Sequence, residues 1–237
     1  MSKEPVFITG VGKRVGLHLA HTFLDRGIPV IGTYRTTRSS VTELEQTGAV
    51  LYQCDFDDDA QIDALIEHVL RKHSALRAII HNASDWLADN AELPSAEIMR
   101  RMMQVHVSAP YKINLALESL LDASEANHAD IIHVGDYVSS RGSKKHIAYA
   151  ASKAAQDNLT LSFAAKLAPR VKVNSLAPAL VMFNPDDDEA YRRKALDKSL
   201  MQCEAGLDEF QHAIDYLLQS HYVTGRVLPM DGGRHLR

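Results

Sequence analysis

The stretch VFITGVGKRVG, residues 6–16, sets the expectation for the fold. Its first residues are apolar and partly β-branched, and Gly10, Gly12 and Gly16 then lead into a stretch with helical spacing. A strand that enters a helix through such a turn lets backbone N–H groups and the helix N-terminus approach a pyrophosphate. Because glycine also serves tight turns in proteins without nucleotides, the turn alone leaves both interpretations open.

The rest of the chain repeats the order strand, then helix. We expect strands at 6–10, 28–35, 49–55, 76–84, 129–137, 171–178 and 225–233. We expect helices at about 13–26, 39–47, 57–73, 95–122, 147–168 and 207–220, with an acidic, irregular segment before the last one. This alternation predicts a single Rossmann-type domain over residues 1–237, an α/β fold with a doubly wound parallel sheet flanked by helices.

The composition is that of an ordinary folded protein, with 237 residues, 46% of them hydrophobic and 24% charged. A net charge of -4 gives no reason to expect nucleic acid or an anionic membrane as a partner. Cys54 and Cys203 show no pairing pattern, and no apolar run has the length of a signal peptide core or a membrane span. We therefore expect a cytoplasmic protein.

The 12 histidines include two pairs with helical spacing, His18 with His21 and His68 with His73. Neither pair has a third ligand nearby or a carboxylate at a useful spacing, so solvated helix faces explain them better. No metal site is expected.

The end of the second predicted strand indicates which nicotinamide cofactor would fit. NAD-specific domains carry an acid there that accepts a hydrogen bond from the ribose 2'-hydroxyl. In this chain Tyr34 and Arg35 end the strand, Arg38 follows, and the first acid is Glu43. A planar, always charged guanidinium suits a 2'-phosphate, so NADPH is the expected cofactor.

Two further strand ends carry polar side chains. Asp55 ends the third strand, where it could accept from an adenine amino group or could instead cap the next helix. The motif HNAS, residues 81–84, ends the fourth strand, at the edge where open α/β sheets bind ligands.

Tyr149 and Lys153, in the motif YAASK, are four residues apart and share one face of a predicted helix. A nearby ammonium favours tyrosinate, so we expect Lys153 to lower the phenol pKa from its ordinary value of about 10. The Tyr would then exchange a proton more readily near neutral pH.

Taken in order, TGVGKRVG, HNAS, YAASK, VNSLAP and VTGRVLPMDGG resemble the short-chain dehydrogenase/reductase family from Thr9 to Gly233. The resemblance implies hydride transfer from NADPH and a homotetramer or homodimer. It makes Tyr149 the catalytic tyrosine, gives Lys153 a second role in binding the nicotinamide ribose, and places Asn82 beside the cofactor. The cofactor residues that follow are Gly10, Gly12, Arg14, Val15, Tyr34, Arg35, Asp55, Asn82, Ala83, Ser84, Tyr149, Lys153 and Pro178.

Three departures from the common family pattern resemble the pteridine reductases, and in detail the bacterial dihydromonapterin reductases. Arg14 replaces a motif glycine, Asp136 occupies the catalytic serine position, and Trp86 follows NAS by one residue. The resemblance implies NADPH-dependent reduction of 7,8-dihydromonapterin, with dihydrofolate as a poorer substrate. The substrate residues expected are Arg14, Ser84, Trp86, Asp136 and Tyr149, with Asp136 also catalytic.

The exchange at Asp136 has a physical rationale. An ionised carboxylate would repel the alkoxide that develops during carbonyl reduction, whereas a pterin presents N–H groups and ring nitrogens to an acceptor or a protonated acid. Asp136 could then organise proton delivery together with Tyr149. Alternatively, Asp136 caps the turn that follows it, and Trp86 packs under a loop instead of stacking on the pterin.

The sequence leaves the roles of His106 and of the C-terminal residues open. His106 stands where many relatives have an Asn that supports the lysine through water, and it is either such a support or a buried structural histidine. The C-terminal RHLR, residues 234–237, is placed to reach a neighbouring subunit's site. The rival functions are a short-chain carbonyl or 3-oxoacyl-thioester reductase, for which Ser would suit position 136 better, and a non-catalytic NADP-binding regulatory protein.

Overall fold

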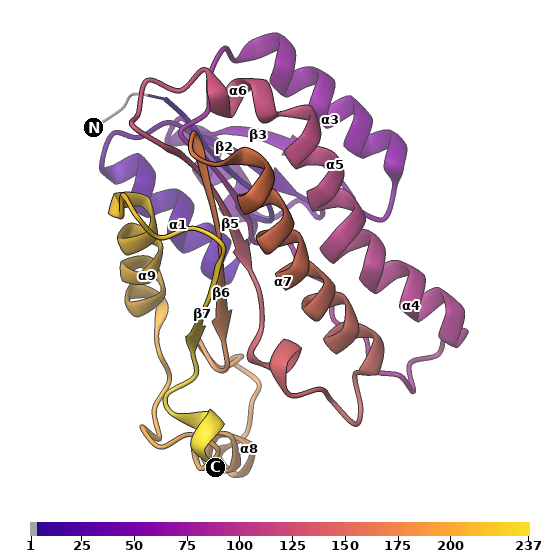
Figure 1. Cartoon of the computed structure of the whole chain (residues 1–237). Helices are drawn as coiled ribbons and strands as arrows, with labels where there is room; N and C mark the ends of the chain where they lie inside the picture. Colours follow the sequence, from indigo (N-terminus) through magenta and orange to yellow (C-terminus); the bar gives the residue numbers. More distant parts are fainter. Residues whose placement is uncertain (1–3) are drawn as a thin grey trace.

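The computed structural model describes residues 4–237, and its centre is one seven-stranded parallel sheet (Figure 1). The strands are β1 (Val6–Ile8), β2 (Val30–Tyr34), β3 (Val50–Gln53), β4 (Ala78–His81), β5 (Ala129–Val134), β6 (Val171–Pro178) and β7 (Arg226–Met230). Their order is β3-β2-β1-β4-β5-β6-β7, and every neighbouring pair is parallel. The predicted α/β fold with a doubly wound parallel sheet is confirmed.

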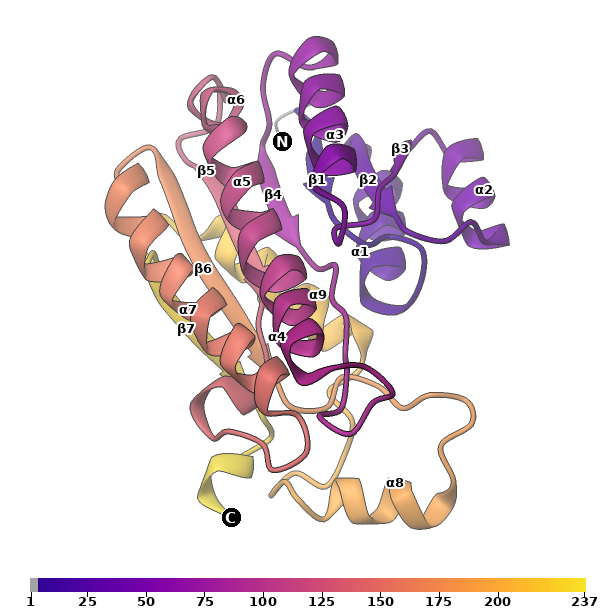
Figure 2. The same cartoon turned by 90° about the vertical axis from the view of Figure 1, so that its right-hand side faces the viewer.

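Helices cover both faces of the sheet, as the two views show (Figures 1 and 2). The α-helices are α1 (Arg14–Asp25), α2 (Ser39–Gln46), α3 (Asp59–Lys72), α4 (Ser95–Met103), α5 (Ala109–Ala116), α6 (Glu118–Asp122), α7 (Ile147–Leu167), α8 (Glu189–Leu196) and α9 (Leu207–Gln219). Three shorter turns of helix are η1 (Gln104–Ser108), η2 (Tyr137–Ser140) and η3 (Arg234–Leu236).

The apolar core forms one layer on each face, because successive side chains of a strand point to opposite sides. In β1, Phe7 belongs to the layer under α3, α5 and α7, whereas Val6 and Ile8 belong to the layer under α1 and α9. A smaller cluster packs Ile98 and Met102 of α4 against the start of α7. This cluster fixes the position of Tyr149 relative to the sheet.

The prediction of one continuous helix over 95–122 is wrong. This stretch is divided into α4, the π-helical turn η1, α5 and α6. Pro110 lies in the first turn of α5, where its missing N–H costs least, and α5 ends before Leu117. Only the overall helical character of this stretch was predictable from its spacing.

The prediction of an irregular acidic segment before the last helix is wrong for residues Glu189–Leu196, which form α8. Asp188 caps this helix by accepting from the Tyr191 N–H at 2.7 Å, and its last turn carries Arg193 and Lys194. No residue of α8 is buried, so the sequence lacks the apolar periodicity by which a helix is recognised.

The strand order reverses between β1 and β4, which are adjacent in the sheet. The connection after β1 leads into α1 on one face, and the connection after β4 leads to α4 and α5 on the other. Divergent connections of this kind open a crevice beyond the carboxyl ends of the strands.

Within residues 4–237, no helix is both long enough and apolar enough to cross a bilayer. The same part of the chain contains no group of three or more His, Cys, Asp or Glu side chains placed to hold a metal ion. Cys54 is buried and Cys203 exposed, and both are free thiols.

Candidate functional site

The crevice at the carboxyl edge of the sheet is a pocket of about 400 Å³, called the cofactor pocket below. Every residue expected to bind the cofactor lines it: Gly10, Gly12, Arg14, Val15, Tyr34, Arg35, Asp55, Asn82, Ala83, Ser84, Tyr149, Lys153 and Pro178. Among the expected substrate residues, Asp136 also lines the pocket and Trp86 does not. The strand ends therefore bring together residues that are far apart in the sequence.

The glycine turn is fixed against the end of β4 by Asn82. Its side-chain N–H donates to the main-chain oxygens of Thr9 at 3.0 Å and Gly10 at 2.9 Å. A Cβ on Gly16 would lie 2.2 Å from the Gly10 oxygen, and Gly10 itself has φ +75°, so both positions require glycine. The side-chain amide of Asn82 thus maintains the shape of the turn.

The N-terminus of α1 opens into the same pocket without a side-chain cap. Its N-cap residue, Lys13, makes no capping hydrogen bond, and Lys13, Arg14 and Val15 all line the pocket. The first N–H groups of a helix have no partner within the helix and favour an anion. This end of the pocket can therefore accept a phosphate group.

Cationic side chains gather where β2 ends. Arg35 and Arg38 both line the pocket, and Arg35 is half-exposed and pairs with Asp85 at 3.2 Å. Asp85 also receives an ion pair from Arg101 at 2.6 Å, so it is not dependent on Arg35. The Arg35 guanidinium can change partner when an anion binds.

Asp55 lines the pocket at the end of β3, and it does not cap α3. The cap is Asp58, which accepts from the Ala60 N–H at 2.9 Å and the Gln61 N–H at 3.4 Å. An Asp55 oxygen accepts from the Asp57 N–H at 3.1 Å. The alternative that Asp55 is a helix N-cap is therefore wrong.

Arg14 joins the glycine turn to the segment after β6. Its backbone is left-handed, with φ 54°, and its guanidinium donates to the Met182 main-chain oxygen at 2.9 Å and to the Asn184 side-chain oxygen. Arg14 therefore links the start of α1 to residues 182–184 of the segment after β6.

Asp136 and Tyr149 are in direct contact. The Tyr149 hydroxyl donates to Oδ2 of Asp136 at 2.8 Å, and Oδ1 of Asp136 accepts from the Val138 N–H at 2.8 Å. One oxygen of Asp136 therefore caps η2 and the other accepts from the tyrosine, and the catalytic role of Asp136 stays a prediction.

The prediction that the pKa of Tyr149 is lowered is wrong for this structure. Burial raises the pKa, and the charge of Asp136 and the hydrogen bond to it raise it further. The Lys153 ammonium is 5.9 Å from the centre of the phenol ring and donates instead to the Val134 oxygen at 2.8 Å and to Gln156 Oε1 at 3.3 Å. Tyr149 therefore holds its proton across the ordinary pH range.

Lys153 is the group near Tyr149 that titrates closest to neutrality. It is buried beneath the tyrosine, and burial lowers its pKa to about 8, although the charges of Asp136 and Asp157 oppose this. Its ammonium is therefore present at neutral pH and is lost in mildly alkaline solution.

His106 is completely buried in η1 and links two serines. Its Nε2 lies 2.8 Å from the Ser84 hydroxyl, and its Nδ1 lies 2.8 Å from the Ser152 hydroxyl. Since Ser152 donates to the Tyr149 main-chain oxygen, it accepts from Nδ1–H, and Nε2 is left to accept from Ser84. Burial and the charge of Lys153 hold the pKa of His106 well below its usual range, so it is a neutral structural link.

Trp86 is 62% exposed and lies outside the cofactor pocket. Its ring packs on His146 at 4.0 Å between ring centroids, with 31° between the planes. It does not pack under a loop, so the alternative of a buried structural Trp is wrong. The expected stacking on a substrate stays a prediction.

Several residues that line the cofactor pocket were not assigned to it from the sequence. They are Lys13, Thr33, Thr36, Arg38, Cys54, Phe56, Val105, Val134 and Gly135. Most of them adjoin the residues that were assigned, so the positions of the strand ends could have indicated them. Val105 comes from η1, which has no sequence signal of its own.

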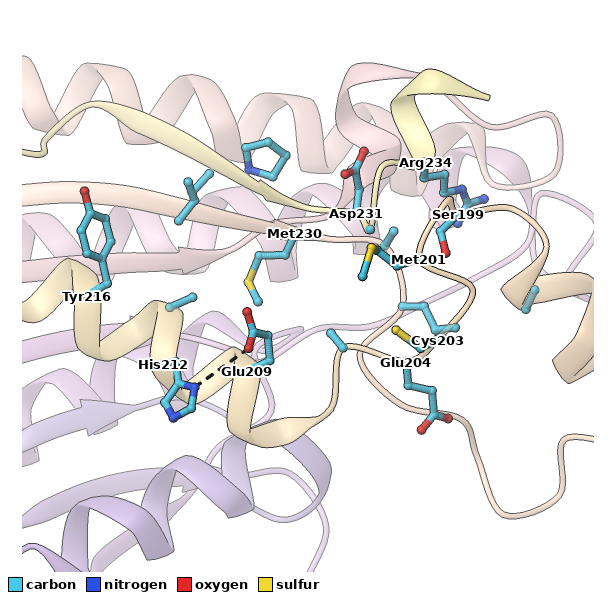
Figure 3. Close-up of a pocket in the computed structure, with 18 residues that line it drawn as sticks. Ser199, Met201, Cys203, Glu204, Glu209, His212, Tyr216, Met230, Asp231 and Arg234 are labelled. Atoms are coloured by element: carbon cyan, nitrogen blue, oxygen red, sulfur yellow. Dashed lines mark ion pairs between the residues drawn. The ribbon is translucent and has the colours of Figure 1, made fainter.

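A larger pocket, of about 730 Å³, lies between α9, β7 and residues 195–205 (Figure 3). Met201 and Met230 contribute apolar surface, and Glu209 and His212 form an exposed ion pair at 4.0 Å on its α9 side. Neither Tyr149 nor Lys153 lines it. Catalytic chemistry is therefore better placed in the smaller cofactor pocket.

Known proteins resemble this chain over nearly its whole length. Dihydromonapterin reductase of Klebsiella pneumoniae is 55% identical over 99% of this chain and 98% of that protein. Dihydromonapterin reductase of Escherichia coli (strain 536) is 52% identical over 98% and 97% of the two chains. The crystal structure of FolM alternative dihydrofolate reductase 1 from Brucella canis, complexed with NADP, has the same fold, with a TM-score of 0.87 at 23% identity over 100% of this chain and 95% of that one.

A family model described as enoyl-(acyl carrier protein) reductase matches residues 10–235, almost the full span of the sheet and its helices. The family match and the two bacterial relatives cover the glycine turn, HNAS and YAASK, the motifs by which the sequence resembles the family. The chain belongs to the short-chain dehydrogenase/reductase family of oxidoreductases.

Proposed function

We propose that this chain is an NADPH-dependent dihydropterin reductase that converts 7,8-dihydromonapterin to tetrahydromonapterin and reduces dihydrofolate more slowly. Relatives that are 52% and 55% identical over nearly the whole chain carry the name dihydromonapterin reductase. The observation that carries the proposal is the 2.8 Å hydrogen bond from Tyr149 to Asp136, a carboxylate where a carbonyl reductase needs a neutral donor.

The cofactor pocket has the donors that NADPH requires. The uncapped end of α1 suits a pyrophosphate, and Arg35 and Arg38 at the end of β2 suit a 2'-phosphate, with no acid at that strand end. Asp55 lies where an adenine amino group can donate to it. When bound, NADPH supplies the hydride.

The chain's own residues would supply and direct the proton. Tyr149 keeps its proton because burial and Asp136 raise its pKa, which makes the phenol a weak acid. It would give the proton to the ring nitrogen that becomes strongly basic when the adjoining carbon receives the hydride, and the Lys153 ammonium would face the phenolate that is left. Each Asp136 oxygen already accepts one hydrogen bond and has a further lone pair. Asp136 can thus accept from a pterin N–H while it orients the phenol.

Lys153 would support this arrangement from below. Its ammonium holds the end of β5 through the Val134 oxygen, next to Asp136, and its third N–H remains for a ribose hydroxyl, as the family resemblance implies. Trp86 would cover the flat face of the substrate with the part of its exposed ring that His146 leaves free.

The rival functions fit these contacts less well. A carbonyl or thioester substrate would place a developing alkoxide against the Asp136 carboxylate, which repels it. A regulatory protein that only binds the nucleotide has no use for Tyr149 in contact with an acid and above a buried ammonium.

One assay separates the three functions: NADPH oxidation with dihydromonapterin, dihydrobiopterin, dihydrofolate and an acetoacetyl thioester in parallel. We expect turnover of the dihydropterins, fastest with dihydromonapterin, and slower turnover of dihydrofolate. Turnover of the thioester alone would refute the proposal, and NADPH binding without turnover of any substrate would favour the regulatory protein. A homodimer or homotetramer is also part of the proposal, and light scattering after gel filtration tests it.

A further inference from the structure

A separate cavity of about 460 Å³ adjoins the catalytic side of the cofactor pocket and shares Asp136 with it. This cavity, called the tail pocket, is lined by Asp136, Tyr137, Val138, Arg141, Gly142, Asp197, Lys198, Arg234 and Arg237. Four of these side chains are cationic and only Asp136 and Asp197 are acidic. The side chains of this cavity therefore carry more positive than negative charge.

The C-terminal residues are held on this chain's own surface, beside the segment that follows α8 (Figure 1). Oδ2 of Asp231 accepts from the His235 backbone N–H at 3.0 Å and contacts its Nδ1 at 2.7 Å. The Met201 N–H donates to the Gly232 oxygen at 3.1 Å, and Figure 3 shows Arg234 close to Ser199. These hydrogen bonds hold η3, and with it Arg234, in a defined position on the chain.

Two guanidinium groups are positioned by Tyr137. Arg234 lies 5.0 Å and Arg141 lies 5.8 Å from the centre of its ring. Arg141 also donates to the His235 main-chain oxygen at 2.6 Å, and Arg237 donates to the Asp197 main-chain oxygen. These contacts orient the cations without neutralising them.

Lys198 and Arg234 lack a carboxylate partner. Across residues 4–237, no Asp, Glu or C-terminal oxygen lies within 4.0 Å of either side-chain cation. Burial lowers the pKa of Lys198, and the nearby charges of Arg234 and Lys194 lower it further. Two like charges that face one cavity and form no ion pair favour a bound anion.

We propose that the tail pocket binds an anionic group, a carboxylate or a phosphate ester, carried on the side chain of the substrate. The inference rests on the proposed function, because a ring held at Asp136 and Tyr149 would lie at the mouth of this cavity. Guanidinium groups match the two-oxygen geometry of both anions. The tail pocket would thus make dihydrofolate a better substrate than its anionic side chain would be without these cations, and would give dihydromonapterin, whose side chain is uncharged, no such advantage.

The test compares a double variant with a control of equal charge. Lys198→Gln/Arg234→Gln removes the two unpaired cations, and Arg71→Gln/Lys72→Gln removes two exposed cations of α3 that do not line the cavity. The readout is the ratio of kcat/KM for an anionic dihydropterin to that for uncharged dihydrobiopterin. Dihydrofolate provides carboxylates, and the monophosphate ester of dihydromonapterin provides a phosphate.

We expect the ratio to fall about tenfold in the Lys198/Arg234 variant for at least one anion, and to stay within about twofold in the control. The anion with the larger fall identifies the group that is bound. Raising the salt concentration should lower the ratio in the wild type more than in the variant. Equal ratios in all three proteins would overturn the inference.

A binding measurement separates this inference from the proposed function. Calorimetry with the NADP⁺-loaded protein compares folic acid with pterin, which lacks the anionic side chain, and requires no turnover. Stronger binding of folic acid that is lost in the Lys198/Arg234 variant supports the tail pocket even if no dihydropterin is reduced. Turnover of dihydrobiopterin with equal binding of folic acid by the variant and its control would contradict the tail pocket alone.

Discussion

The two sides of the cofactor pocket are assembled in different ways. On the glycine-turn side, Thr9, Thr33 and Asn82 make hydrogen bonds to the backbone of neighbouring strand ends, such as the 3.1 Å bond from the Gly10 N–H to the Thr33 hydroxyl. On the catalytic side, a side chain of α7 meets a side chain from the loop after β5, as in the 2.8 Å bond from Tyr149 to Asp136.

The two sides of the pocket therefore differ in how well they tolerate substitutions. A backbone-fixed turn tolerates few substitutions, since a Cβ on Gly16 would overlap the Gly10 oxygen. The catalytic side depends on side chains at the ends of separate elements, so one exchange, at Asp136, can alter the chemistry and leave the nucleotide side intact. The predictions below test whether the two sides are independent in this way.

The largest effect is expected for Tyr149→Phe. Removing the hydroxyl that donates to Asp136 deletes the proposed proton donor, so kcat/KM for dihydromonapterin should fall about a thousandfold. The dissociation constant for NADPH, measured by fluorescence, should stay within about twofold. Tyr216→Phe, an exposed tyrosine of α9, is the control. A loss of less than about tenfold would exclude Tyr149 as the main acid.

The next largest effect concerns the nucleotide side. Arg35→Glu places an acid at the end of β2, so the preference for NADPH over NADH in kcat/KM should fall about thirtyfold, the equivalent of about 2 kcal/mol. The same reversal at the exposed Arg71 of α3 should change nothing. An unchanged preference in Arg35→Glu would show that the 2'-phosphate is bound elsewhere.

A pH profile tests the link between the two sides. The pKa of Lys153 is lowered to about 8, so kcat/KM should fall as the pH rises through that value and the ammonium is lost. Gln156→Leu removes an acceptor 3.3 Å from the ammonium, which disfavours the charged form and should move this limb to lower pH. If Gln156→Leu leaves the pH of the alkaline fall in kcat/KM unchanged, a group other than Lys153 causes that fall.

The smallest effect is expected for Trp86→Ala. Loss of one aromatic face should raise KM for dihydromonapterin about fivefold and leave KM for NADPH unchanged. Trp86→Phe keeps a ring at this position and should recover most of the loss. Equal KM values for dihydromonapterin in the wild type and Trp86→Ala would mean that the ring stays on His146 during the reaction.

The sequence predicted the doubly wound parallel sheet, and the residues expected to bind the cofactor lie together because strand ends in a parallel sheet meet at one edge. Gly10, Arg35 and Asn82 line one pocket for that reason. The pKa of Tyr149 was not predictable from the Y-x-x-x-K spacing, since it depends on Asp136 from another element and on burial. The role of His106 depends on the π-helical turn η1, which has no pattern of its own.

The C-terminal residues show the same limit. The sequence suggested that RHLR reaches a neighbouring subunit, which stays a prediction, and did not indicate that Arg234 and Arg237 line a cavity of their own chain beside Asp136. That placement depends on Asp231, whose oxygens accept from the N–H groups of Gly233 and His235. Hydrophobic periodicity in the sequence does not indicate hydrogen bonds of this kind.

The most direct test of the proposed chemistry is the effect of Asp136→Ser on dihydromonapterin reduction, measured together with the dissociation constant for NADPH. Because a serine hydroxyl is uncharged and has one oxygen, it accepts from a pterin N–H more weakly than the carboxylate and cannot hold Tyr149 at the same time, so kcat/KM for dihydromonapterin should fall about a hundredfold. The NADPH dissociation constant should stay within about twofold, since Asn82 and the glycine turn are untouched. Equal losses in both quantities, or undiminished dihydromonapterin reduction, would contradict the role of Asp136.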